Sequence, residues 1–399
     1  MSLLQGQRPE SRCPNCFSPL PDALWAFRCV NPPCPERLDQ VLSAATGSET
    51  LLRTVTTVTP NGTWRPEHGV ACSACSGATA QEVCPTCHYD LLSGWRLNTT
   101  ICIALAGARA SGKSIYIAVL VKQTELWCAR NGRALLPGDA RTAEMYHRIY
   151  ETPLYVQRGL MSPTPSAAVR DSPHRDPLIF QIGIFNGVPH LLVLRDVAGE
   201  DLEDPQTPTA PFQFFGAADL VLFLFDPMQV AEIQAQLAGL VPDQRLNGGE
   251  PVAVLGNLIR LIRGGSLLGG GRLSTPLALV VAKFDVLAQL ADVEGSPLES
   301  IMDNRGASYN IDPSLEPHLD AEDLSRLQAE VESLLTKLHA QSLLNLADSA
   351  FDIRQTFAVS ALGALPYSAD RVNFHGIAPF RVLDPLKWAF ARRGIIPVN

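Results

Sequence analysis

The stretch Ile101-Cys-Ile-Ala-Leu-Ala-Gly107-Ala-Arg-Ala-Ser-Gly112-Lys113-Ser114 decides how the rest of the chain is interpreted. An apolar run typical of a buried strand leads into the pattern G-x-x-x-x-G-K-S, and a helix-type stretch follows at 115–126. Glycines at both ends of the pattern let the backbone curl, so that successive N–H groups face one anion at the positive end of a helix. This context favours a phosphate-binding loop over a chance match.

The residues of this loop have distinct expected roles. The backbone around the phosphates is expected to come from Gly107, Ala110, Ser111 and Gly112. Lys113 is expected to reach the β- and γ-phosphates and to take part in catalysis, and Ser114 to hold Mg²⁺. The loop alone does not separate ATP from GTP, or a motor from a switch.

A second candidate element is Asp196-Val-Ala-Gly199-Glu200, which directly follows the strand-type run at 190–195. A carboxylate at a strand tip can hold Mg²⁺, directly or through a water, and the N–H of a glycine three residues on can bond a γ-phosphate. Ordinary strand-to-loop turns also use Asp and Gly. The run at 177–185, turned at Asn186-Gly187, predicts a hairpin with this strand and favours the γ-phosphate sensor.

Two further apolar runs carry candidates for base recognition. The run at 276–282 leads into Lys283-Phe284-Asp285, and the run at 357–359 leads into Ser360-Ala361-Leu362. A carboxylate at Asp285 accepts from the N1–H and exocyclic amine of guanine and rejects adenine, which has no donor at N1. The aliphatic stem of Lys283 would lie over the base. The backbone at Ser360 and Ala361 would contact the guanine O6.

The four motifs GARASGKS, DVAG, AKFD and SAL occur in the order and spacing of the translation-factor-related class of P-loop GTPases, which the chain resembles over about 99–396. The resemblance implies a Ras-like α/β domain with a mostly parallel sheet and one antiparallel hairpin strand, and binding and hydrolysis of GTP. The chain departs from that class at two positions: Ala282 replaces an Asn or Thr, and Glu200 replaces a Gln that orients the attacking water. Glu200 is therefore the candidate for the residue that orients the attacking water, and its replacement of Gln leaves the rate of GTP hydrolysis open. Thr164 is the candidate switch I ligand of Mg²⁺.

Eight of the ten cysteines form four close pairs near the amino terminus: Cys13 and Cys16, Cys29 and Cys34, Cys72 and Cys75, Cys84 and Cys87. Thiolates two residues apart on a tight turn can both reach one tetrahedral Zn²⁺, and two such turns complete a four-cysteine site. Disulfides do not fit a nucleotide-binding chain without a secretory segment. The pattern predicts two structural zinc ions, with redox or iron–sulfur use as the alternative. We favour sequential pairing, first pair with second and third with fourth; a cross-braced arrangement is the alternative.

Composition and charge narrow the function classes. Of the 399 residues, 46% are hydrophobic and 18% charged, as in an ordinary globular chain, and the formal net charge is −8. The negative balance argues against a general nucleic-acid binder. No apolar run approaches the ~18 residues of a transmembrane helix, and residues 1–10 do not resemble a signal peptide. We therefore expect a cytoplasmic protein that does not insert into a membrane.

The chain divides into two expected units. Residues 1–95 form a cysteine-rich double zinc-ribbon module, and residues 96–399 form the P-loop GTPase domain, with insertions near 130–176 and 292–319. One continuous helix is expected over 321–346.

The placement of the ribbons before the GTPase, with Phe225-Asp226-Pro227 after the fourth apolar run, resembles the bacterial double-GTPase proteins of multi-gene conflict or defence systems. That resemblance implies protein partners, such as a second GTPase or an effector of the same system. The sequence as a whole predicts a regulatory switch that binds GTP or GDP with Mg²⁺ and docks a partner through its zinc ribbons. An ATPase, and a nucleotide-bound scaffold that barely hydrolyses GTP, are the alternatives.

Overall fold

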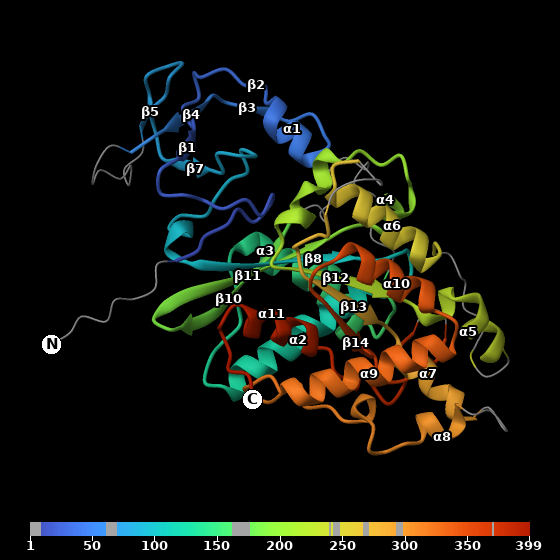
Figure 1. The fold of residues 1–399 in the computed structure, drawn as a ribbon. Helices are drawn as coiled ribbons and strands as arrows, with labels where there is room; N and C mark the ends of the chain where they lie inside the picture. The colour runs from blue at the N-terminus through green and yellow to red at the C-terminus, as the bar shows by residue number, and fades with distance from the viewer. Residues whose placement is uncertain are drawn as a thin grey trace.

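The computed structural model describes residues 9–60, 70–161, 176–238, 241, 248–265, 271–292, 298–368 and 371–399. In these ranges the chain forms a mixed α/β structure around one large sheet, with a small cysteine-rich module at the upper left of Figure 1. No helix of the described residues combines the length and apolar character needed to cross a membrane.

The central sheet has seven strands in the order β14-β13-β12-β8-β11-β10-β9. Their bounds are β8 Thr99–Ala106, β9 Leu136–Pro137, β10 Leu178–Phe185, β11 Val188–Asp196, β12 Leu220–Phe225, β13 Leu277–Val281 and β14 Arg354–Ala358. The five neighbouring strands β11, β8, β12, β13 and β14 run parallel to one another. Strand β10 is antiparallel to β11, and β9 is antiparallel to β10. The predicted mostly parallel sheet and its hairpin are confirmed. The short strand β9 was not predicted.

Helices cover both faces of the sheet, which explains why its central strands are apolar throughout. Figure 1 shows α2 (Lys113–Arg130) and α11 (Asp384–Arg392) below the sheet and α4 (Gly199–Glu203) and α6 (Pro251–Ile262) above it. Helices α2 and α11 pack through Trp127 and Phe390, whose ring centroids are 5.9 Å apart. The strands are thus buried in a three-layer core.

The expected helix over 321–346 is two helices, α9 (Ala321–Lys337) and α10 (Gln341–Ala350). The break falls at His339, whose φ of 61° lies in the left-handed region. The N–H of Ala340 bonds the carbonyl of Leu335 at 2.9 Å, as in a helix-terminating Schellman turn. The remaining elements of this part of the chain are α3 Ala140–Met145, η2 Tyr146–Val156, η4 Ala210–Ala217, η5 Pro227–Gln229, α5 Ala231–Gln236, α7 Phe284–Ala288, η6 Gln289–Asp292, α8 Glu299–Met302 and η7 Ser308–Asn310.

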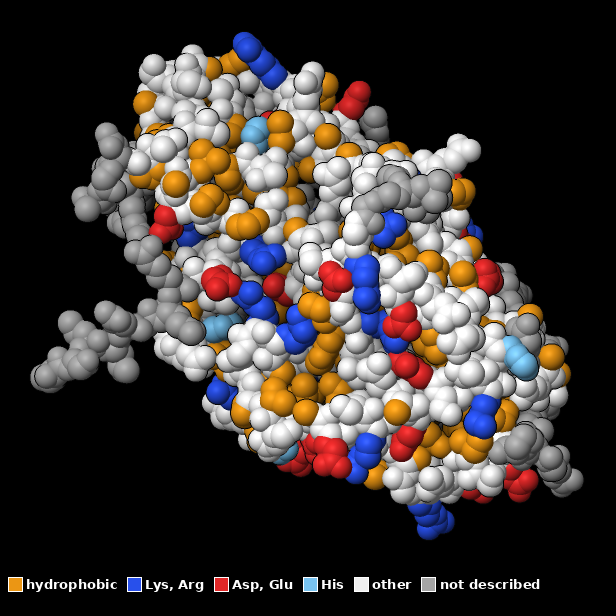
Figure 2. Space-filling model, viewed as in Figure 1, with side chains coloured by type: hydrophobic (Ala, Val, Ile, Leu, Met, Phe, Trp, Pro, Cys, Tyr) orange, Lys and Arg blue, Asp and Glu red, His pale blue; other side chains and the backbone are white. Residues whose placement is uncertain are grey.

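The amino-terminal module is built on one three-stranded antiparallel sheet, in the order β4-β1-β7. Its elements are β1 Trp25–Arg28, β2 Arg37–Leu38, α1 Gln40–Thr46, β3 Leu51–Leu52, β4 Val55–Val58, β5 Val70–Ala71, β6 Ala78–Thr79, β7 Gln81–Val83 and η1 Trp95–Leu97. Figure 2 shows hydrophobic side chains gathered on the visible face of the module. Its exposed apolar side chains include Val30, Leu38 and Leu51.

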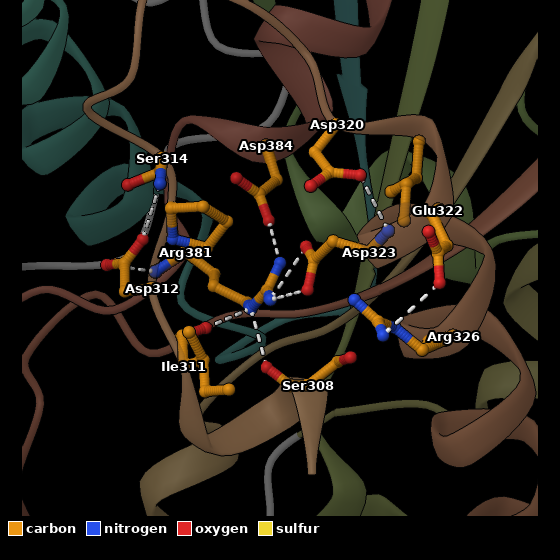
Figure 3. Close-up of polar contacts among 12 residues, drawn as sticks. Ser308, Ile311, Asp312, Ser314, Asp320, Glu322, Asp323, Arg326, Arg381 and Asp384 are labelled. Carbon is orange, nitrogen blue, oxygen red and sulfur yellow. Dashed lines mark hydrogen bonds and ion pairs between the residues drawn. The ribbon is translucent and has the colours of Figure 1, made fainter. Parts of the chain in front are cut away.

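A buried ionic cluster centred on Arg381 holds the segment that leads to α11 (Figure 3). The guanidinium donates to both carboxylate oxygens of Asp323 at 2.9 Å, to Asp384 Oδ2 at 2.6 Å, and through Nε to the carbonyl of Ile311 at 2.6 Å. Burial raises the pKa of Asp384 to about 6, an effect that the Arg381 charge opposes. The residue before Arg381, Phe380, pairs with Ser360 through two backbone hydrogen bonds. The cluster therefore anchors the segment around Phe380, which pairs with Ser360.

Candidate nucleotide site and metal centres

The G-x-x-x-x-G-K-S loop joins the end of β8 to the start of α2, as the sequence predicts. A Cβ on Gly107 would lie 2.2 Å from the carbonyl oxygen of Leu224, so only glycine fits between the loop and β12. The Lys113 side chain folds back over the loop, and its Nζ donates to the carbonyls of Gly107 at 2.7 Å and Ala108 at 2.9 Å. The ammonium group thus lies at the mouth of the loop.

The interior of the loop has the curled backbone expected of an anion cradle. Ala110 and Gly112 have φ angles of 57° and 90°. The buried Ser111 hydroxyl donates to the carbonyl of Ala108 at 2.9 Å. Ser114 lies in the first turn of α2. These residues surround the amino end of an 18-residue helix, where N–H groups and the helix dipole favour an anion.

Asp196 and Gly199 lie beside this loop. Asp196 ends β11 and pairs in register with Leu105, one residue before β8 ends. A Cβ on Gly199 would be 2.3 Å from the N of Arg109, so this turn rests directly on the backbone of the loop. Burial lowers the pKa of Lys113, and the Asp196 carboxylate opposes that shift. The structure therefore brings the lysine, the carboxylate and the glycine together.

Two glutamates contact the loop arginine, Arg109. Glu200 Oε1 is 3.0 Å from Arg109 Nη2, in a pair whose side chains are more than a third exposed. Glu203 Oε1 accepts from the backbone N–H of Arg109 at 2.7 Å and from that of Gly249 at 3.0 Å. Glu200 thus has a cationic partner, and Glu203 is a further candidate site residue that the sequence analysis missed. Only the α4 turn, seen in three dimensions, brings Glu203 to the loop.

Asp285 and Ser360 meet at the carboxyl ends of β13 and β14. The Ser360 hydroxyl donates to Asp285 Oδ1 and accepts from the N–H of Gly363 at 2.8 Å. Burial raises the pKa of Asp285, and the hydrogen bond from Ser360 opposes that shift. Ala361 is half-buried next to this pair. Two motifs 75 residues apart in sequence therefore form one polar pair.

Lys283 is held by a carboxylate that the sequence analysis did not assign to the site. Its Nζ lies 2.6 Å from Oδ2 of Asp226, which directly follows β12 and is 2% exposed. Lys283 has a φ of 50°, and its Cε lies 3.9 Å from the position of a Cβ on Gly112. The contact places the Lys283 stem along the phosphate loop, although Ala282 cannot supply the usual polar tie. A carboxylate directly after an apolar run was the available signal for Asp226. Thr164, the switch I candidate, lies outside the described residues.

The eight paired cysteines gather into two four-cysteine clusters. Cys13, Cys16, Cys84 and Cys87 form the inner cluster, and Cys29, Cys34, Cys72 and Cys75 form the outer cluster. Within each cluster the sulfur atoms lie within 4.8 Å of one another, and all eight cysteines are free thiols. The first pair therefore joins the fourth, and the second joins the third.

Both the sequential pairing and the cross-braced alternative are wrong. The reason lies in the module sheet, where β1 is the central strand between β4 and β7. The register of β1 with β7 brings the Cys84 turn back beside the amino-terminal turn at Cys13. The second and third cysteine pairs then form the outer cluster. Sequence spacing alone does not report this nesting.

The geometry of both clusters fits zinc. Four sulfurs at about 2.3 Å from a tetrahedral zinc lie about 3.8 Å apart. In the inner cluster the Sγ–Sγ distances are 3.6 Å for Cys13 and Cys87 and 3.7 Å for Cys16 and Cys84. In the outer cluster the distance is 3.7 Å for Cys29 and Cys75. Three of the pairs form the same tight turn, each followed by a left-handed residue with a φ of 58–59°: Phe17, Ser76 and His88. Two zinc ions could thus be held, one by each cluster.

These features define the class of protein: a mixed α/β protein with a strand–loop–helix phosphate-loop motif on a mostly parallel sheet and two four-cysteine clusters. No family model matches the chain. Over 394 residues the chain is 44% identical to the "Putative ESX-1 scaffolding and assembly protein SaeC" of Mycolicibacterium smegmatis, with 97% of this chain and all of the relative covered. The chain belongs to the same family as that protein.

Among solved structures, the bacterial selenocysteine-specific elongation factor EF-Sec is 12% identical, with a TM-score of 0.24, over 65% of this chain. Sup35 complexed with GMPPNP is 15% identical, with a TM-score of 0.26, over 73% of this chain. The chain spans only 25% and 44% of those two chains. The name of the M. smegmatis relative refers to scaffolding and assembly, so the resemblance to conflict-system proteins gains no support.

Proposed function

We propose that the chain is a guanine-nucleotide switch of Ras-like topology, comprising a P-loop domain over 96–399 and a zinc module over 1–95. The observation that carries the proposal is the direct contact of the Gly199 turn with the backbone of the loop that begins at Gly107. In such a site, a turn that touches the phosphate loop senses the γ-phosphate. The strand order also fits: the hairpin of β10 and β11 flanks β8, and β12 to β14 follow on its other side.

The site residues have defined tasks in this proposal. Lys113 turns from the loop carbonyls to the β- and γ-phosphates. Ser114 and Asp196 hold Mg²⁺, which neutralises phosphate charge when bound. The N–H of Gly199 bonds the γ-phosphate, so loss of that phosphate frees α4 and the residues up to 204. Asp285 reads the base, supported by Ser360 and Ala361, while Asp226 keeps Lys283 extended along the site.

A slowly hydrolysing scaffold is a second candidate, favoured by the ion pair of Glu200 with Arg109. A carboxylate held by an arginine is less available to orient water than a glutamine amide. We expect single-turnover GTP hydrolysis to be slow, and Glu200→Gln to accelerate it by about tenfold. The measurement is phosphate release from enzyme in excess over GTP. A fast wild-type reaction that Glu200→Gln slows would make Glu200 the catalytic group instead.

The partner is proposed to be protein. The relative's name refers to scaffolding and assembly, and the module exposes Val30, Leu38 and Leu51. Eight thiols that serve as metal ligands fit a reducing compartment, which supports a cytoplasmic location. We expect neither general nucleic-acid binding nor insertion into a membrane.

The proposal predicts a change of base specificity in Asp285→Asn. The asparagine amide can donate to the C2 oxygen of xanthine, whereas the native carboxylate accepts from the guanine amine. We expect the preference of GTP over XTP to shift by about a hundredfold or more toward XTP. The measurement is displacement of fluorescent GTP by GTP, XTP and ATP at equilibrium, with the exposed Asp292→Asn as the control. Equal competition by ATP, together with no effect of Asp285→Asn, would support the ATPase alternative.

A further inference from the structure

The inner cysteine cluster is attached to the strand that carries Asp196. Arg195, one residue before this carboxylate, donates through Nη1 to the backbone carbonyl of Asn15. Asn15 lies inside the turn formed by Cys13 and Cys16, and it is 2% exposed. Its own N–H bonds Cys13 Sγ at 3.4 Å, and its side-chain amide bonds Cys87 Sγ at 3.7 Å. One residue therefore links two cysteines of the cluster to the base of the Asp196 turn.

Aromatic packing adds a second link. The Arg195 guanidinium lies 3.8 Å from the ring centroid of Phe214, in η4, the element that follows α4. Phe17, in the inner turn, meets the same ring edge-on with centroids 5.4 Å apart. All three side chains are buried. The inner turn thus contacts the chain both before and after the segment 196–204 that is proposed to respond to nucleotide.

Charge favours the same arrangement. Zinc bound by four thiolates carries a net charge of about −2, which is costly to bury without a nearby cation. Arg195 is 8% exposed and lies beside the inner cluster. Because its planar guanidinium can donate and stack at once, Arg195 joins β11 both to Asn15, inside the cluster's turn, and to Phe214.

The outer cluster is the natural comparison. It forms its own small apolar group, separate from the main core that includes Cys13 and Cys87. In the described part of the chain, the side chains of the outer cluster form hydrogen bonds with module residues such as Asn31 and Thr54. The two clusters have the same chemistry but different attachments.

We propose that Arg195 is a positioning residue that couples the inner cysteine cluster to the Asp196–Gly199 turn. Zinc in the inner cluster fixes the turn, and through it the nucleotide site, whereas zinc in the outer cluster does not. Only the measurement of GTP affinity in the test of this inference rests on the proposed nucleotide function. The ordering of the turn itself is measurable without nucleotide.

The matched test compares Cys16→Ser with Cys75→Ser, each a half-buried cysteine that closes its turn. Zinc content is measured by elemental mass spectrometry, hydrogen exchange by peptides covering 196–204, and affinity with fluorescent GTP. We expect each variant to lose one zinc. Only Cys16→Ser should exchange faster at 196–204 and bind GTP about tenfold more weakly. Equal effects of the two variants, or loss of the inner zinc with unchanged exchange, would overturn the proposal.

Arg195→Met tests the coupling even if the cysteine variant fails to fold, because it leaves all eight cysteine ligands in place. We expect two zinc ions, faster exchange at 196–204 and about tenfold weaker GTP binding. Arg195→Lys, which keeps the charge and one donor, should restore part of the protection. Exchange in Arg195→Met equal to that of the wild type would show that Arg195 does not couple the two sites. If the wild type binds no nucleotide, the proposed function fails, and the exchange result alone still decides the coupling.

Discussion

Replacing Lys113 with alanine is expected to reduce the affinity for GTP by at least about a hundredfold. The ammonium group is buried and bonded to the carbonyls of Gly107 and Ala108, at the mouth of the loop. In the proposed complex it exchanges these partners for two phosphate groups. Each charge-assisted hydrogen bond contributes about 1.5–3 kcal/mol, so the loss of two corresponds to a factor of about a hundred or more.

Lys122→Ala is the control for this prediction. Lys122 lies on the same helix and pairs with Glu151 at 2.5 Å, away from the loop. Equilibrium binding of fluorescent GTP should show wild-type affinity for this variant and a large loss for Lys113→Ala. Wild-type affinity in Lys113→Ala would mean that the loop does not hold the phosphates.

The second large effect concerns stability: Arg381→Met is expected to lower the free energy of unfolding by about 3–5 kcal/mol. The guanidinium is fully buried and faces the carboxylates of Asp323 and Asp384. Without it, both carboxylates stay in the core with no matching charge. Denaturant unfolding measures the loss. Arg326→Met is the control, because Arg326 forms an exposed pair with Glu322 and should cost less than about 1 kcal/mol.

The loss in Arg381→Met is also expected to depend on pH. Burial already raises the pKa of Asp384 to about 6, and the Arg381 charge opposes that rise. Removing the arginine raises this pKa further, so the folded state binds the proton more tightly than the unfolded chain does. The stability defect should therefore be smaller at pH 5 than at pH 8. A deficit below about 1 kcal/mol at pH 8 would contradict the proposed role of the cluster.

Features set by contiguous sequence could be predicted. The turn between β8 and α2 was predictable because Gly107, Gly112 and Lys113 lie within one short stretch between an apolar run and a helix. That this turn binds phosphate stays a prediction. The hairpin was predictable because Asn186 and Gly187 adopt φ angles of 51° and 79°, which few other residue pairs tolerate. The parallel sheet followed from apolar runs separated by helical stretches.

Features that depend on contacts between residues far apart in the sequence could not be predicted. The cysteines were assigned as ligands from spacing, but the nesting of their pairs depends on β1 lying between β4 and β7. Arg381 stands in an ordinary loop sequence, and only the meeting of α9, η7 and α11 makes it the centre of a cluster. Glu203 and Arg195 become candidate residues only through partners 94 and 180 positions away.

Calorimetric titration of the zinc-loaded wild-type protein with GTP and Mg²⁺ tests the central claim, guanine-nucleotide binding at the Lys113 loop, most directly. We expect one binding site per chain for GTP, with ATP giving no comparable heat. A protein that carries two zinc ions and unfolds cooperatively, but gives no heat with either GTP or GDP, would contradict that claim.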